Sequence, residues 1–577
     1  MGGVANTILV ARPAPTRRAQ ARGALVAVAH MRLMMLMLLF AAAVLLVIGR
    51  LSMLAAFGGS EARANVATLA ARGDIVDRNG QPLARTIDSW TIAVHPRQLM
   101  GDRTELAARL AALMPDRGDQ NWFHSQLTRD TSFVWLEHRA SPQLVEQVNA
   151  LGEPAIVFAR ETQRLYPQSD MAAHALGFLS VDGHGMSGME RVLDQRLLSP
   201  ANAGAPVQLA MDTRVQAAME SELGRAMTAF SARAASGVVL DVNTGEVIAM
   251  VSLPTFNPNR VGMAGSEQLR NVTTQNVYEL GSTFKPITVA AAIDNGVVTD
   301  MSRRFDATRP MQIGGFTIHD DRGDEQERWL DIPETLIYSS NIATARIADE
   351  VGAARMQAMF RAMGFDQKPA IELRERGRPL WPGYWARTTV MTTAYGHGIA
   401  ITPLQLAQAY AALVNGGVWR PATMMKVPAG QAVPGRRVIS EATSARMRQL
   451  LRLIVQLGTG RRGDAPGYRV GGKTGTAEAA SGGGYDHSRN VATFAAAFPM
   501  DAPRYVVLAM LDSPLGTHET FGLKTAAWNA APVVGRVIAR TGAMLGVTPD
   551  MNRDIDVHEL MPLIWHAPGP QRGIPPQ

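Results

Sequence analysis

Ser282 and Lys285 stand three residues apart in the segment Tyr278–Pro286 (YELGSTFKP). Pro286 lacks a backbone N–H and clashes with the turn before it, so it fits only the first turn of a helix. We therefore predict a helix that begins at or beside Ser282, with Lys285 on the same face. A hydroxyl beside a lysine that loses its charge can act as a nucleophile with its general base. A helix cap and a surface lysine would explain the same residues without chemistry.

A second polar group, Ser339-Ser340-Asn341, precedes an apolar helical pattern over Ala343–Val351. Capping of that helix is the simple structural explanation. The functional alternative is that Ser339 relays protons and Asn341 bonds a substrate amide. The triplet alone fits both explanations.

A third group, Lys473-Thr474-Gly475-Thr476, lies in a predicted strand over Arg469–Ala477. Alternation along the strand separates Lys473 and Gly475, on one face, from the two threonines on the other. A glycine weakens a strand and often marks the close approach of a ligand or another backbone. At a sheet edge, free N–H groups of this strand could pair with a peptide. An ordinary strand with a surface lysine is the alternative.

Two groups of strand patterns flank a mainly helical block, at about residues 270–460. The first is a hairpin over Ser236–Met250, which follows an amphipathic helix over Asp212–Phe230. The second group is closed by a helix over Lys524–Leu545, and its strands are predicted over Arg469–Ala477, Val491–Phe498 and Tyr505–Asp512. This order predicts an α+β domain over residues 206–550, an antiparallel sheet covered by helices.

The region before this domain, residues 58–205, mixes short strand patterns with helices such as Glu105–Leu113 and Pro142–Leu151. It contains no titratable cluster of catalytic type, so we predict a pedestal domain. After the second domain, residues 551–577 are rich in proline and glycine. We predict that this tail is disordered.

The first 32 residues contain five arginines and no acidic residue, so their charge is +5. Since the formal net charge of the whole chain is +7, the remaining residues contribute only +2. The basicity is therefore local, and we predict no nucleic-acid groove. An apolar segment over 33–57, interrupted once at Arg50, is long enough to cross a bilayer. The arginines predict a cytoplasmic tail over 1–32 and a periplasmic remainder. The alternative, a signal peptide cleaved near Ala62-Arg63-Ala64, has a shorter apolar core.

The composition of the chain limits the other classes of protein and of site that are possible. The chain has 577 residues, 46% of them hydrophobic and 19% charged, which predicts a globular protein of two or more domains. It has no cysteine, so disulfides, thiolate metal sites and a cysteine nucleophile are excluded. His397 lacks an evident aspartate partner, and we predict a structural loop histidine. The acidic stretch His319–Glu325 lacks fixed ligand spacing, and we predict a solvated turn rather than a metal site.

The three motifs, in this order, resemble the pattern shared by penicillin-binding proteins and serine β-lactamases. The whole chain resembles class B penicillin-binding proteins, and among them the septal type of Gram-negative bacteria. The further similar segments are Arg72–Gly80, Arg164–Pro167, Gly188–Glu190, Tyr395–Gly398 and Thr402–Gln405. The stretch Glu519–Gly546, with Trp528-Asn529-Ala530-Ala531-Pro532, resembles septal enzymes of α-proteobacteria. Leu280 stands where the family usually has proline, and we expect this to alter only the local turn.

The resemblance implies a D,D-transpeptidase that cross-links peptidoglycan stem peptides during septal cell-wall synthesis and is acylated by β-lactams. Ser282 would attack the penultimate D-Ala carbonyl, with Lys285 as general base. Ser339 and Lys473 would transfer protons at the leaving amine, and Asn341 would bond a substrate amide. An amine on a neighbouring stem would then take the acyl group.

The resemblance also implies the binding groups and the partners. Thr474, Gly475 and Thr476 would bind the substrate or a β-lactam, the two threonines holding its carboxylate. Backbone N–H groups of Ser282 and Thr476 would form the oxyanion hole. No metal or organic cofactor is implied. The expected partners are peptidoglycan stem peptides, β-lactams, a polytopic septal glycan polymerase and other division proteins of the inner membrane.

Several alternatives remain. A β-lactamase needs a base that activates water; Glu372 and Glu375 lie in a suitable interval, but their context does not resemble that site. A carboxypeptidase would pass the acyl group to water and stays open. A 32-residue tail is too short for the signalling domain of a β-lactam sensor. A catalytically silent division scaffold predicts loss of a motif residue, and none is lost. A role in elongation instead of division also stays open.

Overall fold

The computed structural model describes residues 31–50, 53, 72–199, 201, 205–321, 323–481 and 484–565. The chain divides into two units after Ala71. In the first unit, the helix Met31–Arg50 exposes its large apolar side chains and is the one described helix long and apolar enough to cross a membrane. This agrees with the predicted anchor, whose residues 51–52 and 54–57 lie outside the described residues. Residues 1–30 and Ala62–Ala64 lie outside them too.

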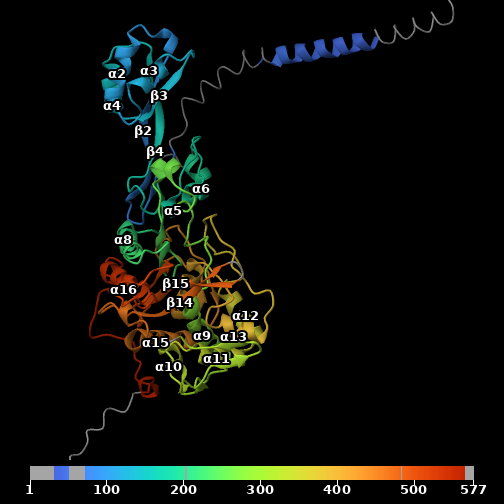
Figure 1. Ribbon diagram of the computed structural model, residues 1–577, viewed down its shortest axis with the longest axis vertical. Coiled ribbons are helices and arrows are strands. Elements are labelled where there is room, and N and C mark those ends of the chain that lie inside the picture. Colours follow the sequence, from blue (N-terminus) through green and yellow to red (C-terminus); the bar gives the residue numbers. More distant parts are fainter. Residues whose placement is uncertain are drawn as a thin grey trace, which may run out of the picture. The chain divides into compact units, whose positions relative to one another are not determined.

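The pedestal is built on a sheet in which β2 pairs antiparallel with β3 and β4, and β1 joins β2 to β5. The strands are β1 (Ile75–Val76), β2 (Pro82–Val94), β3 (Val134–Ala140), β4 (Ile156–Leu165) and β5 (Val207–Gln208). Its three larger helices are α2 (Arg103–Leu113), α3 (Gln120–Leu127) and α4 (Pro142–Asn149). Figure 1 shows them gathered at one end of the long strands β2 and β4. Asp102, Asp119 and Ser141 cap these helices, which explains where each begins.

A buried ion cluster joins three segments of the pedestal. Glu190, in α6 (Gly188–Val192), accepts hydrogen bonds from Arg72 Nε at 2.8 Å and from Arg164 Nε at 2.7 Å. All three side chains are buried. The Asn79-Gly80 turn between β1 and β2 places Gly80 at a φ of 85°, as expected of such a hairpin. Three of the segments that resembled the family, Arg72–Gly80, Arg164–Pro167 and Gly188–Glu190, therefore meet around the carboxylate of Glu190.

The second domain contains the predicted antiparallel sheet, with strand order β14-β15-β16-β6-β7. The strands are β6 (Ala234–Asp241), β7 (Val247–Leu253), β14 (Gly471–Ser481), β15 (Gly484–Phe498) and β16 (Tyr505–Asp512). The predicted hairpin and three later strands are confirmed, although β15 begins seven residues before the predicted Val491. Because β14 pairs with β15 alone, the strand that carries Lys473 lies at an edge.

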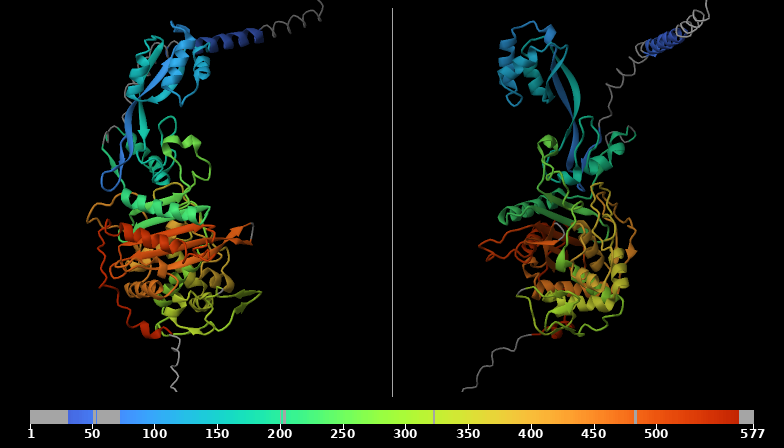
Figure 2. Two further views of the ribbon diagram at one scale, coloured as in Figure 1. Left: turned by 60° about the vertical axis from the view of Figure 1, so that its left-hand side comes forward. Right: turned by 45° about the vertical axis from the view of Figure 1, so that its right-hand side comes forward.

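Helices cover both faces of this sheet, which confirms the α+β class. α8 (Thr213–Ala229) and α16 (Ala530–Thr541) pack on one face, and α14 (Pro403–Val414) and α15 (Glu441–Leu457) lie on the other. Figure 2 shows α16, in red, and the yellow and orange helices on opposite sides of the strands. α16 is shorter than the predicted Lys524–Leu545, because the chain up to its N-cap Asn529 forms a loop.

Smaller elements complete both domains. The helices are α5 (Ala173–Leu176), α7 (Asp194–Leu198), α9 (Lys285–Asp294), α10 (Ile332–Ile337), α11 (Asn341–Val351), α12 (Ala353–Ala362) and α13 (Arg387–Thr393). The short paired strands are β8 (Phe305–Asp306) with β11 (Trp329–Leu330), β9 (Met311–Ile313) with β10 (Phe316–Ile318), and β12 (Val418–Trp419) with β13 (Arg436–Arg437).

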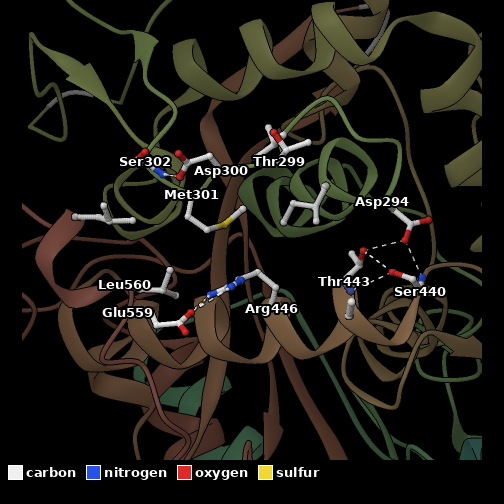
Figure 3. A pocket seen from close by; sticks show the side chains of 14 residues that line it. Asp294, Thr299, Asp300, Met301, Ser302, Ser440, Thr443, Arg446, Glu559 and Leu560 are labelled. Atoms are coloured by element: carbon white, nitrogen blue, oxygen red, sulfur yellow. Dashed lines mark hydrogen bonds and ion pairs between the residues drawn. The ribbon is translucent and has the colours of Figure 1, made fainter.

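The prediction of a disordered tail is wrong for residues 551–565. Leu560 and Ile564 are buried, and Trp565 N donates to Glu334 Oε1 at 2.9 Å. Figure 3 shows the nearby ion pair of Glu559 with Arg446, 3.4 Å long, at a cavity of about 950 Å³. The high proline and glycine content of the last residues led to the prediction of disorder and concealed the few apolar residues that pack against the domain. Residues 566–577 lie outside the described residues.

Candidate active site

Ser282 lies in a 3-10 turn over Gly281–Phe284, and α9 begins immediately after it at Lys285. Pro286 occupies the first turn of α9, so the prediction of a helix beginning at or beside Ser282 is confirmed. Thr283 fixes this turn in two ways: its hydroxyl donates to Leu280 O at 2.8 Å, and its carbonyl accepts from Tyr410 OH at 2.9 Å. The turn therefore holds Ser282 at a defined place on the domain.

Three glycines let three backbone segments meet around Ser282. A Cβ on Gly475 would lie 2.3 Å from Leu280 O, and one on Gly396 would lie 2.3 Å from Gly281 O. Gly281 has a φ of 55°, and its Cβ would lie 2.9 Å from Thr476 O. The expected close approach at Gly475 is confirmed, and the approaching group is backbone. A direct role of Gly475 in binding substrate stays a prediction.

The Ser339 hydroxyl lies between the two lysines of the motifs. It accepts hydrogen bonds from Lys285 Nζ at 3.1 Å and from Lys473 Nζ at 2.9 Å, and Lys285 also donates to Ser339 O. Ser339 has a φ of 59°, a conformation that costs a non-glycine residue about 1–3 kcal/mol and that the surrounding contacts must hold in place. The next residue, Ser340, caps α11 by accepting from Ala343 N at 3.1 Å. The triplet thus both caps a helix and builds the site.

Burial shifts the protonation of both lysines. Lys285 and Lys473 are completely buried. Desolvation lowers the pKa of Lys285 to about 8, although Asp321 and the neighbouring aspartates favour its charged form. Desolvation, and next the charge of Lys285, hold the pKa of Lys473 well below its ordinary value. A fraction of the Lys285 amine is therefore neutral near physiological pH, as a general base requires.

The described hydrogen bonds of Lys285 Nζ go to Ser339, and none of them reaches the Ser282 hydroxyl. Catalytic hydrogen bonds are often completed only when substrate is bound, so this arrangement is compatible with Lys285 as base.

Ser282, Ser339, Thr474 and Thr476 line one cleft of about 660 Å³. Lys473 Nζ donates to Thr474 O at 3.0 Å, and the Thr474 hydroxyl lies 2.7 Å from that of Thr459. Thr476 Oγ1 accepts from Ala526 N at 3.1 Å. The cavity of Figure 3 is larger but has no motif residue on its walls, so we place the chemistry in the cleft of Ser282.

The side chain of Asn341 is hydrogen-bonded to the loop at residues 319–321. Its Nδ2 donates to His319 O at 3.0 Å and to Asp321 Oδ1 at 3.3 Å. In this arrangement the amide joins the loop at residues 319–321 to the start of α11. Its predicted contact with a substrate amide stays a prediction.

The acidic stretch is only in part the solvated turn that its composition predicted: His319, Asp321 and Glu325 are exposed, but Asp320 is not. Asp320 is buried, and it accepts from Ser340 Oγ at 2.9 Å and from Ile342 N at 3.0 Å. Asp321 and Asp324 line the catalytic cleft, where burial and next the charge of Asp321 raise the pKa of Asp324. The prediction failed for Asp320 because nothing in the spacing indicated that this loop folds back onto α11. The described residues contain no metal-ligand cluster.

Two glutamates considered as bases for water lie elsewhere. Glu372 accepts from Met424 N at 3.0 Å, and Glu375 accepts from Gly188 N at 3.4 Å. Neither lines the cleft of Ser282. His397 lies in the glycine-flanked loop with Nδ1 3.5 Å from Glu279 Oε2, and burial lowers its pKa. Its surroundings fit the predicted structural role.

The cleft also has walls that the motifs did not identify. They are formed by Thr459 and by the loop before α16, which contributes Leu523, Lys524, Thr525, Ala527 and Trp528. The only sequence signal for them was the resemblance of Glu519–Gly546 to septal enzymes. Thr459 gave no signal, because its contact with Thr474 is made across the fold.

A serine in one cleft with the hydroxyl that two buried lysines share, at the edge of an antiparallel sheet, is an arrangement suited to a serine acyl-transferring enzyme. Two family models match it: the penicillin-binding protein transpeptidase domain over residues 235–535, and the penicillin-binding protein dimerisation domain over residues 67–200.

Individual proteins match along most of the chain. The probable peptidoglycan D,D-transpeptidase FtsI of Caulobacter vibrioides is 42% identical, over 83% of this chain and 82% of its own length. The peptidoglycan D,D-transpeptidase FtsI of Escherichia coli is 28% identical, over 85% and 86%. The crystal structure of penicillin binding protein 3 from Mycobacterium tuberculosis, complexed with aztreonam, superimposes with a TM-score of 0.66 at 27% identity, covering 84% of this chain and 98% of that one. The chain belongs to the class B penicillin-binding proteins and is a serine penicillin-binding transpeptidase.

Proposed function

We propose that this chain cross-links peptidoglycan stem peptides during septal wall synthesis through an acyl-enzyme on Ser282, and that β-lactams acylate the same serine. The observation that carries the proposal is the Ser339 hydroxyl, which accepts from both buried lysines in the cleft that Ser282 lines. A serine hydroxyl in such a position can pass protons between the lysines and a reacting group.

In acylation, the Ser282 hydroxyl attacks the penultimate D-Ala carbonyl and gives its proton to neutral Lys285. The oxyanion that forms is bonded by the backbone N–H groups of Ser282 and Thr476, and one such donor typically lowers the barrier by about 3–4 kcal/mol. When the C–N bond breaks, the leaving D-Ala amine takes a proton delivered through Ser339 from the lysine pair. An ester on Ser282 and free D-Ala result.

In the second step, an amine of a neighbouring stem attacks the ester carbonyl. The amine loses a proton to the lysine pair, the ester C–O bond breaks, and the Ser282 hydroxyl is restored. Thr474 and Thr476 line the cleft beside Lys473, where their hydroxyls can hold the carboxylate of the substrate or of a β-lactam. The proton that leaves with D-Ala in the first step is replaced by the proton that the acceptor amine gives up in the second.

The experiment that tests this function uses the full chain in detergent. We expect fluorescent penicillin to label it, with the adduct mass on Ser282, and Ser282→Ala to abolish labelling. A D-Ala-D-Ala pentapeptide with an amine acceptor should give free D-Ala and a cross-linked product. Labelling that persists in Ser282→Ala would refute the nucleophile. Hydrolysed peptide without any cross-link would assign a carboxypeptidase instead.

We also propose the predicted topology and boundaries: a cytoplasmic tail over 1–32, a membrane helix over 33–57, a periplasmic pedestal over 58–205 and a transpeptidase domain over 206–550. Reporters fused after residue 32 and after residue 100 test the orientation. A reporter at residue 100 that is active only in the cytoplasm would contradict it.

For the septal role, we propose contacts with a glycan polymerase and other division proteins of the inner membrane. The names of the relatives from Caulobacter vibrioides and Escherichia coli support this choice. Depletion should give long cells without septa and of normal width. Rounded cells that still divide would assign the enzyme to elongation and leave the acylation chemistry untouched.

A further inference from the structure

A second cavity, of about 370 Å³, lies beside the catalytic cleft, and Trp528 lines both. Its walls come from α8, from a 3-10 turn over Arg461–Gly463, and from α16 with the loop before it. Each of these elements contributes one arginine: Arg225, Arg462 and Arg536. We call this space the arginine cavity.

Two of these arginines are fixed in place by a buried carboxylate. Glu222, whose side chain is 1% exposed, pairs with Arg225 and lies 2.7 Å from Arg536 Nε. Arg540 also reaches Glu222, at 2.8 Å. Including Glu519 on the wall, four guanidinium groups face two carboxylates, so the surroundings keep a charge of +2. An anion entering the cavity meets donors already held in position, which lowers the cost of binding it.

Arg462 differs from the other two. Its guanidinium carbon lies 3.6 Å from the centroid of the Trp528 ring, a stacked arrangement. None of the ion pairs found among the described residues includes Arg462. Stacking orients the flat guanidinium and leaves its N–H groups available for a carboxylate.

The backbone is shaped to bring Arg462 and Arg536 together. A Cβ on Gly535 would lie 3.0 Å from Asp464 O and 3.3 Å from the Gly463 carbonyl carbon. The missing side chain lets α16 approach the 3-10 turn closely, one residue before Arg536. Two arginines that are 74 residues apart in the sequence therefore line one cavity.

We propose that the arginine cavity is a second anion-binding subsite, which holds a carboxylate of a stem peptide while another part of that peptide lies in the catalytic cleft. The proposal rests on the proposed function, because it requires a stem peptide in the cleft. A stem peptide with a γ-linked D-glutamate carries a free α-carboxylate outside the D-Ala-D-Ala end, and this group is the ligand. Trp528 lies between the two spaces, where its ring can contact the peptide.

The test uses the full chain and two synthetic pentapeptide donors, one with the free α-carboxylate and one with the same group as a primary amide. We expect the wild type to prefer the acid by roughly tenfold or more in kcat/KM for D-Ala release, because a charge-assisted hydrogen bond is lost in the amide. Arg462→Gln should abolish the preference, mainly through KM, and Arg462→Lys should restore part of it.

Arg461→Gln is the matched control, because Arg461 is adjacent in the same turn and does not line the cavity. It should keep the wild-type preference. The rate of labelling by fluorescent penicillin should be equal in all variants, since the penicillin lacks the remote carboxylate. A second arm makes the same acid-to-amide change in the acceptor peptide. A preference found there and lost in Arg462→Gln supports the subsite, with the carboxylate coming from the acceptor.

The subsite is overturned if Arg462→Gln keeps the wild-type preference, or if the wild type shows no preference in either arm while it releases D-Ala normally. A failure of the proposed function looks different. In that case neither donor releases D-Ala and penicillin does not label Ser282, and the subsite is rejected with the function.

Discussion

Charged side chains are buried both in the ion cluster of the pedestal and in the active site of the transpeptidase domain, and the two places differ in how charge is balanced. In the pedestal, Glu190 lies between Arg72 and Arg164, at 2.8 and 2.7 Å. In the active site, Lys285 and Lys473 share the hydroxyl of Ser339, which carries no charge.

The difference follows from what each place must do. A buried ion that is paired and hydrogen-bonded keeps its charge, so the pedestal cluster fixes three segments without reactivity. Burial without a directly paired carboxylate disfavours the charged form of each lysine, and the charge of Lys285 adds to this effect at Lys473, so desolvation lowers the pKa of both amines. The aspartates of the acidic loop limit that decrease for Lys285 but do not cancel it. Direct pairing of opposite charges holds segments of the pedestal together, and burial of amines without such pairing prepares the chemistry of the active site.

The largest effect on activity is expected from Lys285→Met. General bases typically contribute a factor of about 10² to 10⁴, so the second-order rate of acylation by penicillin should fall by that much. The melting temperature should stay equal or rise, because a buried amine without a carboxylate partner is replaced by an apolar side chain of similar length. Stopped-flow acylation and thermal unfolding measure the two. A variant that acylates normally would remove Lys285 from the mechanism.

The largest effect on stability is expected from Glu190→Gln. It leaves Arg164 buried without a carboxylate, while Arg72 keeps Asp194 at 2.7 Å, and the broken pair should cost about 3–5 kcal/mol of unfolding free energy. Denaturant unfolding measures this, with Glu146→Gln on the exposed face of α4 as the matched control. The folded fraction should still be acylated at the wild-type rate. A loss of acylation without a loss of stability would contradict the division of roles between the two places.

The motif residues were predictable because their relations are local. One helical turn relates Ser282 to Lys285, and strand alternation places Thr474 and Thr476 together. The triplet allowed Ser339 as a proton relay, but spacing could not place its hydroxyl between the two lysines, since it lies 54 residues from one and 134 from the other.

Other features left no usable local signal. Asp320 caps α11 only because its loop folds back, and Leu560 and Ile564 anchor a segment whose composition suggested disorder. The pedestal cluster likewise joins residues more than a hundred positions apart. Where chain segments distant in sequence meet, propensity and spacing carry no information about the contact.

An effect of intermediate size is expected in the pH dependence of acylation and of stability, which tests how burial affects Lys285. The pKa of Lys285 lies near 8 in the folded chain and near 10.4 in an unfolded one. Acylation should therefore increase about tenfold per pH unit below pH 8 and level off above it. The folded state binds fewer protons than the unfolded state between these two values, so unfolding free energy should rise with pH across that window. Lys285→Met should lose the contribution of this group. A flat acylation profile between pH 6 and 8 would contradict a neutral amine as base.

The smallest effect is expected from Thr474→Val, which changes a neutral group beside the lysine pair. The Thr474 hydroxyl lies 2.7 Å from that of Thr459 and points into the cleft wall that we assign to the carboxylate of the substrate. Losing one hydrogen bond to a charged group should slow acylation roughly tenfold, with a change in melting temperature of only a few degrees.

Thr459→Val is the matched control: it removes the partner hydroxyl but not the proposed contact, so its acylation rate should fall less. If both variants slow acylation equally, Thr474 acts through its partner and not through the substrate. If Thr474→Val instead lowers stability strongly and leaves acylation of the folded fraction unchanged, the hydroxyl belongs to the packing of the strand. Thr474 would then be assigned to the residues that hold the fold together and not to those that serve the reaction.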